Sequence, residues 1–453
     1  MQDGFTHHRK KAEDYVRGYA SWFTDRVGKR LVYCQQYVKG LFHACRSNIE
    51  RMEERLPDTS YDGLHHFISE ACWDGQGVMG QVAGEVQASL SALPGEQGLL
   101  LDECGWAKAG SQSVGVGRQY IGALGKTENG QVGVFAGLVR GAHAGLVGAH
   151  LYLPQAWCSD TARCQQARIP AANRAYRSKP ELATQLVEEL LGSGAVTADW
   201  VGGDALYGGS PGLRQALQAM GQAYVLDIQP TLHVYTADPT PAAGPVWSGR
   251  GRRPKRLQPV GVTASLQAVV AAAAGTDPWP VHVHRPGTKG PLRRRALLVE
   301  VWLWSAEDQT AKSLQLLTSS ELDGSEIKYS LCYSPPNAPV LTVHTALQRQ
   351  MQRYWIERLF QEAKQQLGVH QSQTRSWTAW YHHMALSLMA MHFMLKTQLE
   401  GDAEMPYLSF ASIKLLLAQK LRNKLDNDDA LMRAISKRSS YLKPTQPQKS
   451  GVT

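Results

Sequence analysis

The stretch "LLLDE", residues 99–103, is a short apolar run that ends in two acids, the pattern of a buried central strand. A second apolar run, "VTADWVGGD" at 196–204, also ends in an acid. Parallel strands bring their carboxyl ends to the ligand-binding edge of an open sheet. Asp102 and Asp204 are therefore candidates for one common site.

The residues around these two runs predict further elements. They are two hairpin strands, "QVGVFAGLVRG" (131–141) and "LVGAHLYLP" (146–154), joined by "AHAG"; a helix, "SKPELATQLVEELLGSG" (178–194), with Ser178 as N-cap; a second helix, "SPGLRQALQAMGQ" (210–222); and a strand, "AYVLDI" (223–228). The order strand, strand, strand, helix, strand, helix, strand predicts an α/β fold built on a mixed sheet flanked by helices.

Composition divides the chain into five parts. They are a helical N-terminal region (1–92), an α/β part (93–228), a Pro-rich and β-rich part (229–345), a helical part (346–437) and a polar tail expected to be disordered (438–453). Residues 1–92 fit a DNA-binding helix-turn-helix and a packing or dimerisation bundle equally well.

The chain is basic, with a formal net charge of +9 and a pI near 9.1. This balance favours a polyanionic partner such as nucleic acid, although a merely basic surface is the other interpretation. The densest positive charge lies in "RGRRPKR" and "RRR", and two more cations lie in Gly-rich loops. The candidate phosphate-binding residues are Arg118, Lys126, Arg250, Arg252, Arg253, Lys255, Arg256, Arg293, Arg294 and Arg295.

Neither a secretory signal nor a membrane span is expected. The N-terminus lacks the apolar core of a signal peptide, and the longest apolar run, "MALSLMAMHFML" at 384–395, is too short to cross a bilayer. The seven cysteines include no CxxC pair, so reduced thiols in a cytoplasmic protein are expected.

The sequence "RYWIERLFQEAKQQLG" at 353–368 predicts one amphipathic helix with Arg353, Glu357 and Lys364 at the margin of its apolar stripe. Glu357 on a helix covering the ends of the two strands would complete an oxygen cage with Asp102 and Asp204. Carboxylates suit two Mg²⁺ ions, with Mn²⁺ able to substitute. The simpler alternative is that each acid is satisfied locally, Glu357 by Arg353 one turn earlier.

This helix resembles the signature helix of DDE-superfamily insertion-sequence transposases, Tyr-x2-Arg-x3-Glu-x6-Lys. Arg353, Glu357 and Lys364 match at the right spacing, whereas Gln350 stands at the Tyr position. The blocks around "LLLDECGWAKAG", "LYLPQAWCSD" and "WVGGDALYGGSPG" also resemble a bacterial subgroup of this superfamily. The resemblance runs in order from about residue 60 to about residue 395.

The resemblance implies a ribonuclease-H-like catalytic core interrupted by a β-rich insertion domain, with a helical N-terminal domain. It implies that Asp102, Asp204 and Glu357 hold two Mg²⁺ ions and that Arg353 and Lys364 neutralise DNA phosphates. The implied partner is double-stranded DNA, both transposon ends and target, bound by a homodimer in a nucleoid-associated synaptic complex. The function that the resemblance implies is that of a DNA transposase, which cleaves the transposon ends and transfers the 3′-OH into target DNA. A domesticated DNA-binding protein or repressor, and a nuclease without strand transfer, are the alternatives to this function.

Overall fold

The computed structural model describes residues 11–43, 47–56, 59–242, 256–275, 279–285, 290–401 and 409–421. The chain forms two compact units, the first of residues 1–79, 166–169 and 362–453 and the second of residues 80–165 and 170–361. The boundary between them falls inside three helices, α5 (Gly75–Ser91), α7 (Thr161–Gln166) and α13 (Tyr354–Leu367).

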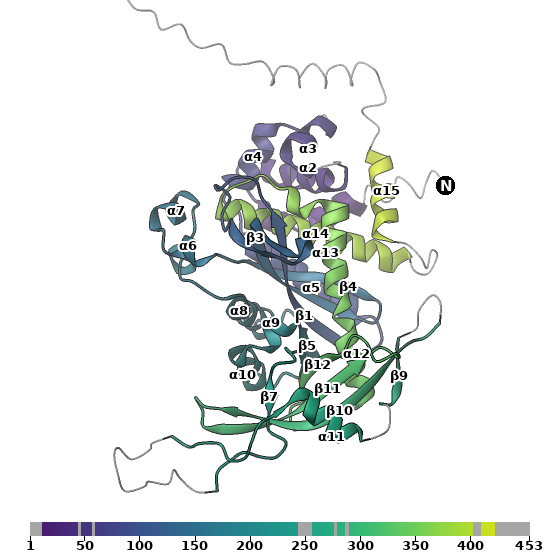
Figure 1. Ribbon diagram of the computed structural model, residues 1–453. Helices are drawn as coiled ribbons and strands as arrows, with labels where there is room; N and C mark the ends of the chain where they lie inside the picture. The colour runs from purple at the N-terminus through teal and green to yellow at the C-terminus, as the bar shows by residue number, and fades with distance from the viewer. Residues whose placement is uncertain are drawn as a thin grey trace, which may run out of the picture. The chain divides into compact units, whose positions relative to one another are not determined.

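In the described part of the second unit, ten strands form one mixed sheet in the order β2-β3-β1-β5-β6-β12-β11-β10-β9, with β4 beside β3 (Figure 1). The pairs β1–β5 and β5–β6 are parallel and the other pairs are antiparallel. The strands are β1 (Gln97–Ala107), β2 (Gly117–Ile121), β3 (Lys126–Arg140), β4 (His143–Leu151), β5 (Trp200–Gly203), β6 (Tyr224–Asp227), β9 (Val281–Arg285), β10 (Leu292–Ser305), β11 (Thr310–Ser320) and β12 (Lys328–Tyr333); β7 (His233–Val234) and β8 (Ala264–Ser265) form a separate pair.

Helices cover both faces of this sheet. The remaining helices of the second unit are η2 (Gly122–Leu124), α6 (Gln155–Cys158), η3 (Ala171–Asn173), α8 (Lys179–Gly192), α9 (Ala205–Gly208), α10 (Pro211–Ala219), α11 (Leu266–Ala274) and α12 (Val343–Gln352). Phe135 on β3 packs edge-on against Phe360 of α13, whereas Gly148, which pairs with Ala136, lies against Leu186 of α8. Because successive strand residues face opposite ways, α8 and α13 lie on opposite faces.

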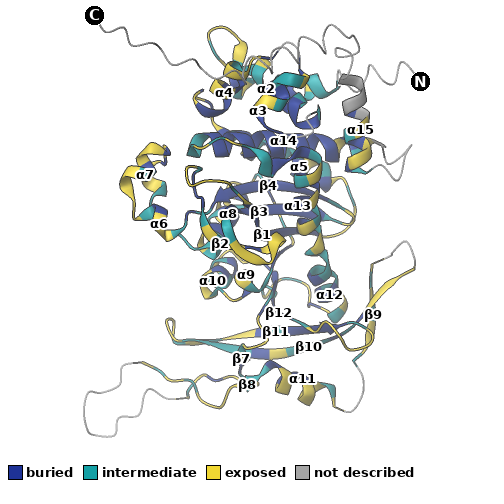
Figure 2. Cartoon of the chain, turned by 45° about the horizontal axis from the view of Figure 1, so that its top comes forward, coloured by how far each residue is buried: buried dark blue, intermediate teal, exposed yellow. Residues whose placement is uncertain are grey.

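The core follows from this arrangement. Strands β1, β3 and β4 are buried along most of their length, as the dark colouring in Figure 2 shows, whereas β9 alternates between exposed and half-buried residues. These strands were predicted from near-continuous apolar runs, and they are covered on both faces. The predicted mixed sheet flanked by helices is confirmed.

Local signals account for the element boundaries. At the start of α8, Glu181 N donates to Ser178 Oγ at 3.4 Å and Ser178 N donates to Glu181 Oε2 at 2.7 Å, which confirms the predicted N-cap as a capping box. The hairpin loop is shorter than predicted, since β4 already begins at His143. Gly141 adopts φ +59°, which lets the chain reverse immediately after β3.

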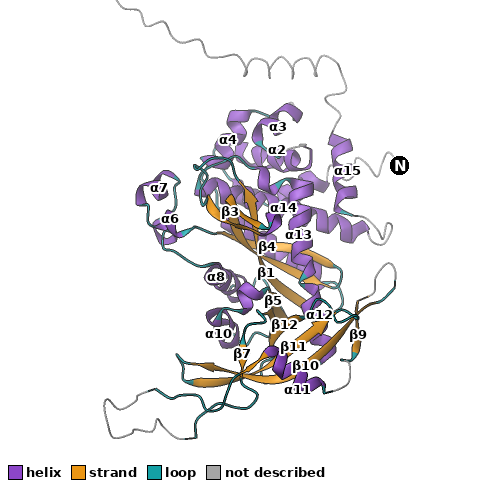
Figure 3. Ribbon diagram, viewed as in Figure 1, coloured by secondary structure: helices purple, strands orange, loops and turns teal. Residues whose placement is uncertain are grey.

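The described residues of the first unit form helices and loops (Figure 3). Besides parts of α5, α7 and α13, the helices are η1 (Ala20–Phe23), α2 (Lys29–His43), α3 (Ile49–Arg55), α4 (Tyr61–Ser69), η4 (Val369–Gln371), α14 (Trp377–Gly401) and α15 (Phe410–Leu421). The buried helix α14 contacts α2, α4 and α15, so helices from both ends of the chain share one core. Within the described ranges, no helix combines the length and apolarity needed to cross a bilayer.

Two histidines tie α14 to its neighbours. His382 contacts the carbonyl oxygens of Ile68 and Trp73 at 2.9 and 2.8 Å and stacks on the Trp73 ring. His383 contacts Tyr37 Oη and Val369 O, each at 2.8 Å. Both side chains are buried, and all four ring nitrogens have partners, so these residues hold helices together.

We predict that Gly208→Ala destabilises the protein, because a methyl group there would overlap the backbone carbonyl of Asp227. Such overpacking typically lowers the free energy of unfolding by about 1–3 kcal/mol. Urea denaturation would measure the loss. Gly212→Ala is the matched control, since its nearest neighbour is Ser210 Oγ at 4.0 Å and alanine favours the helix. Equal stability of the two variants would contradict this packing argument.

Candidate functional site

Three acids lie at matching register positions of neighbouring parallel strands. Leu101 of β1 pairs with Gly203 of β5, and Gly203 pairs with Leu226 of β6. The residue that follows each of these is acidic: Asp102 within β1, Asp204 directly after β5, and Asp227 at the end of β6. Neighbouring parallel strands therefore deliver three carboxylates to the carboxyl edge of the sheet, where open α/β sheets bind ligands.

Asp102 and Asp204, together with Glu103, form a group that could hold a metal ion. One carboxylate oxygen of each lies within 4.8 Å of the other two. Backbone amides fix two of these side chains: Glu103 N donates to Asp102 Oδ1 at 2.8 Å, and Leu206 N donates to Asp204 Oδ1 at 2.9 Å as the N-cap contact of α9. The three carboxylates could therefore supply oxygen ligands to a metal ion.

Glu103 is fixed differently, by side chains on both of its oxygens. Lys179 Nζ donates to Oε1 at 2.9 Å and Tyr207 Oη donates to Oε2 at 3.0 Å. Lys179 is the first residue of α8, immediately after the N-cap Ser178. Glu103, Lys179 and Tyr207 are not among the site residues predicted from the sequence, and the second acid in "LLLDE" was the available signal for Glu103.

Burial and mutual repulsion raise the pKa values of the paired aspartates. Burial, followed by the negative charge of Asp204, raises the pKa of Asp102 from 3.8 to about 8, whereas Arg353 acts in the opposite direction. Burial and then the charge of Glu103 raise the pKa of Asp204. Carboxylates held this way are strongly stabilised by a cation, and their all-oxygen donor set fits Mg²⁺ or Mn²⁺.

Arg353 connects this group to the helix at 354–367. It lies at the junction of α12 and α13, so the predicted helix is confirmed but begins one residue later. Its Nε lies 3.2 Å from Asp227 Oδ2, and its Nη1 lies 3.1 Å from Glu357 Oε1 and 4.0 Å from Asp102 Oδ2. Glu357, in the first turn of α13, thus faces Arg353 and is outside the three-acid group.

The other signature positions lie on the same two helices. Lys364 lies in the last turn of α13. Gln350, at the position of the signature tyrosine, is buried, and its Nε2 donates to Ser330 Oγ while its Oε1 accepts from Ser319 Oγ, both at 2.6 Å.

The predicted phosphate-binding residues differ in accessibility. Arg118, Lys126, Arg256 and Arg293 are exposed, Lys126 with an ion pair to Glu128. Arg294 is buried against Glu321, and Arg295 donates to the carbonyl oxygens of Trp279 and Leu322. Arg250, Arg252, Arg253 and Lys255 lie outside the described residues.

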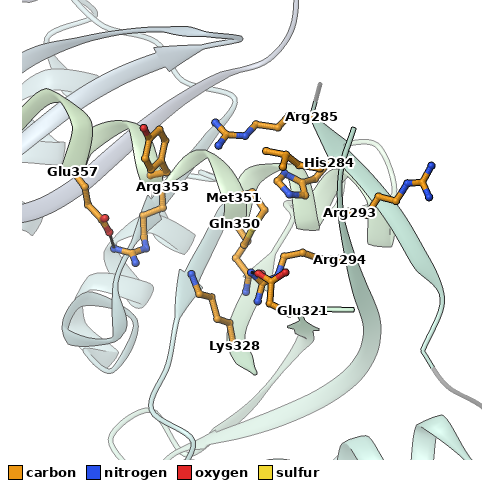
Figure 4. A pocket seen from close by; sticks show the side chains of 12 residues that line it. His284, Arg285, Arg293, Arg294, Glu321, Lys328, Gln350, Met351, Arg353 and Glu357 are labelled. Atoms are coloured by element: carbon orange, nitrogen blue, oxygen red, sulfur yellow. Dashed lines mark hydrogen bonds and ion pairs between the residues drawn. The ribbon is translucent and has the colours of Figure 1, made fainter. Parts of the chain in front are cut away.

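A basic cavity of about 300 Å³ adjoins Arg353 and Glu357 (Figure 4). Its lining includes Arg285, Arg293 and Lys328 from three strands. The Arg285 guanidinium lies 5.1 Å from the ring centroid of Tyr354, a cation–π contact at the start of α13. The cavity therefore offers positive charge and an aromatic face beside the carboxylates.

Comparison with known proteins adds an independent finding. A family model described as "DDE superfamily endonuclease" matches residues 23–291, more than half of the chain. A protein of Microchaete diplosiphon, described as a probable transposase for insertion sequence element IS701, is 32% identical over 212 residues, covering 44% of this chain and 49% of that protein. The chain thus spans about half the length of this curated relative.

We predict that, without divalent cations, the free energy of unfolding falls between about pH 5 and about pH 8. Folded Asp102 keeps its proton up to about pH 8, whereas the unfolded chain releases it near 3.8, so the folded state binds more protons over this range. Asp102→Asn should reduce this decline and raise the stability at pH 8 above that of the wild type.

Urea denaturation in EDTA at several pH values would measure this difference. Asp308→Asn, which removes a carboxylate that contacts Ser305 and Gln215, is the charge-matched control. The same pH slope in wild type and Asp102→Asn would contradict the raised pKa.

Proposed function

The chain belongs to the DDE superfamily of endonucleases, and from this premise we propose that it is a metal-dependent DNA transposase of a bacterial insertion sequence. The observation that carries the proposal is the group of crowded, half-buried carboxylates formed by Asp102 and Glu103 of β1 and by Asp204 directly after β5. The relative from Microchaete diplosiphon, described as a probable transposase, supports the same activity.

We propose a ribonuclease-H-like catalytic core for the second unit. The strand path β4-β3-β1-β5-β6, antiparallel as far as β1 and parallel beyond it, supports this assignment. Residues 229–345 would be its β-rich insertion domain, although β12 continues the sheet by pairing with β6. The helices of residues 1–92 would bind DNA or mediate dimerisation in a synaptic complex.

Asp102 and Asp204 would hold two Mg²⁺ ions, with Glu357 as third carboxylate and Glu103 beside them. When bound, the ions would activate the attacking oxygen and stabilise the leaving one. Lys179 and Tyr207 keep Glu103 oriented, and the amides at the start of α9 orient Asp204. Water would attack the phosphodiester at the transposon end and cleave its bond to the 3′-oxygen, which leaves as a 3′-OH while the phosphate stays on the flanking strand. This 3′-OH would then attack a phosphodiester of target DNA and displace the 3′-oxygen of the target strand.

The DNA backbone would lie along the basic residues near this edge. Arg353 at the junction of α12 and α13, Lys364 on α13 and the exposed Arg293 at the cavity would supply positive charge for phosphate oxygens. Arg118 and Lys126, on the hairpin of β2 and β3, are proposed contacts further along the duplex.

We expect Asp204→Asn to abolish excision of the element and lower end cleavage in vitro by at least about 100-fold, because it removes an anionic ligand at the reacting phosphate. The measurement is plasmid excision with the cognate ends, together with Mg²⁺-dependent cleavage of end DNA. Asp308→Asn should retain wild-type activity. Persistent excision by Asp204→Asn would contradict the site assignment.

The wild-type result separates the three functions. Cleavage followed by joining to target DNA supports the transposase. Cleavage without joining indicates a nuclease, and binding of end DNA without cleavage indicates a DNA-binding protein or repressor.

We further expect Arg293→Gln to weaken binding to duplex DNA and to lower the slope of log affinity against log salt by about 1, as the loss of one phosphate contact predicts. Lys312→Gln is the matched control, since Lys312 is an exposed cation on β11 outside the cavity lining. Fluorescence anisotropy over a salt series would measure both variants. Equal salt slopes for the two would argue against a phosphate at Arg293.

A further inference from the structure

Asp227 differs from the other acids at the sheet edge because both of its oxygens are already engaged. Ser330 Oγ donates to Oδ1 at 2.6 Å, and Arg353 Nε lies 3.2 Å from Oδ2. Although Asp227 stands level with Asp102 and Asp204, it is not part of the group that could hold a metal. Asp227 is therefore placed to hold the side chain of Arg353.

A chain of hydrogen bonds orients the carboxylate of Asp227. Gln350 Nε2 donates to Ser330 Oγ, which in turn donates to Asp227, and Ser319 Oγ donates to Gln350 Oε1. Ser319, Ser330 and Gln350 are each at most 4% exposed. Buried groups whose donors and acceptors are matched hold one geometry, because any other arrangement leaves a polar atom unsatisfied.

The opposite end of Arg353 faces carboxylates of the candidate metal site. Its Nη1 lies 3.1 Å from Glu357 Oε1 and 4.0 Å from Asp102 Oδ2. A guanidinium that moved further toward these oxygens would compete with a divalent cation for them. Its position between Asp227 and this pair therefore affects how strongly Asp102 and Glu357 bind a metal.

We propose that Asp227 is a positioning residue: it holds Arg353 through Nε, limits the approach of the guanidinium to Asp102, and so leaves this carboxylate available to a divalent cation. Ser330 and Gln350 act through Asp227. This assignment rests on the proposed metal-dependent function and gives Gln350, which replaces the signature tyrosine, a definite task in the site.

The test is a double-mutant cycle on the affinity of the full-length protein for Mn²⁺, measured by electron paramagnetic resonance without DNA. Asp227→Asn should weaken Mn²⁺ binding about tenfold, the usual effect of losing a residue that orients a metal site. In an Arg353→Gln background, the same substitution should change the affinity less than about twofold, because the residue it restrains is gone.

Two further variants make the result decisive. Ser330→Ala keeps the charge of Asp227 but removes its donor, so it should weaken Mn²⁺ binding by a smaller factor, again only when Arg353 is present. Asp308→Asn removes a charge without touching Arg353 and should leave the affinity unchanged. Ser330→Ala also serves as the test variant if Asp227→Asn does not fold, as judged by thermal unfolding.

Equal weakening by Asp227→Asn in both backgrounds would overturn the proposal, since Asp227 would then act as a metal ligand, as a general charge or through the fold. Unchanged affinity in the Arg353-containing protein would overturn it as well. A wild-type protein that binds no Mn²⁺ would instead refute the proposed metal-dependent function, and the positioning role with it.

Discussion

The crowding of negative charge at one edge of the sheet is the constraint on which the rest of the second unit depends. Asp102, Asp204 and Asp227 end up side by side because β1, β5 and β6 are parallel neighbours in register. Half-buried carboxylates this close together are unfavourable unless cations or hydrogen-bond donors compensate for them. Each element that reaches this edge brings such a group.

These compensating groups come from helix ends. The amides at the start of α9 bind Asp204, Lys179 projects from the first residue of α8, and Arg353 lies where α12 passes into α13. A helix end offers unpaired backbone N–H groups and a change of chain direction. Its side chains can therefore point along the sheet edge, whereas the apolar faces of α8 and α13 remain packed on the sheet.

The sequence predicts the positions of the helices and strands well, but it predicts less completely which distant residues they contact. Apolar runs ending in acids identified β1 and β5, and the Ser178 signal fixed the start of α8, because these are local patterns. Asp227 follows the apolar run of "AYVLDI" in the same way. Its proposed role as a positioning residue, however, depends on the pairing of β6 with β12 and on its contact with Arg353. Such contacts join residues more than a hundred positions apart, and a single sequence has no local pattern that predicts them.

Gln350 shows how one buried polar side chain can join a helix to two neighbouring strands. A tyrosine hydroxyl offers one donor and an acceptor at the end of a long side chain, and the glutamine amide offers both roles as well. In this protein the two roles are used toward Ser330 on β12 and Ser319 on β11, which are adjacent antiparallel strands. The residue thereby links α12, the strands of 229–345 and the acid that holds Arg353. Replacement by an apolar residue would remove the hydrogen-bond partner of two buried hydroxyls, those of Ser319 and Ser330, and this cost is a sufficient physical reason for a polar side chain at position 350.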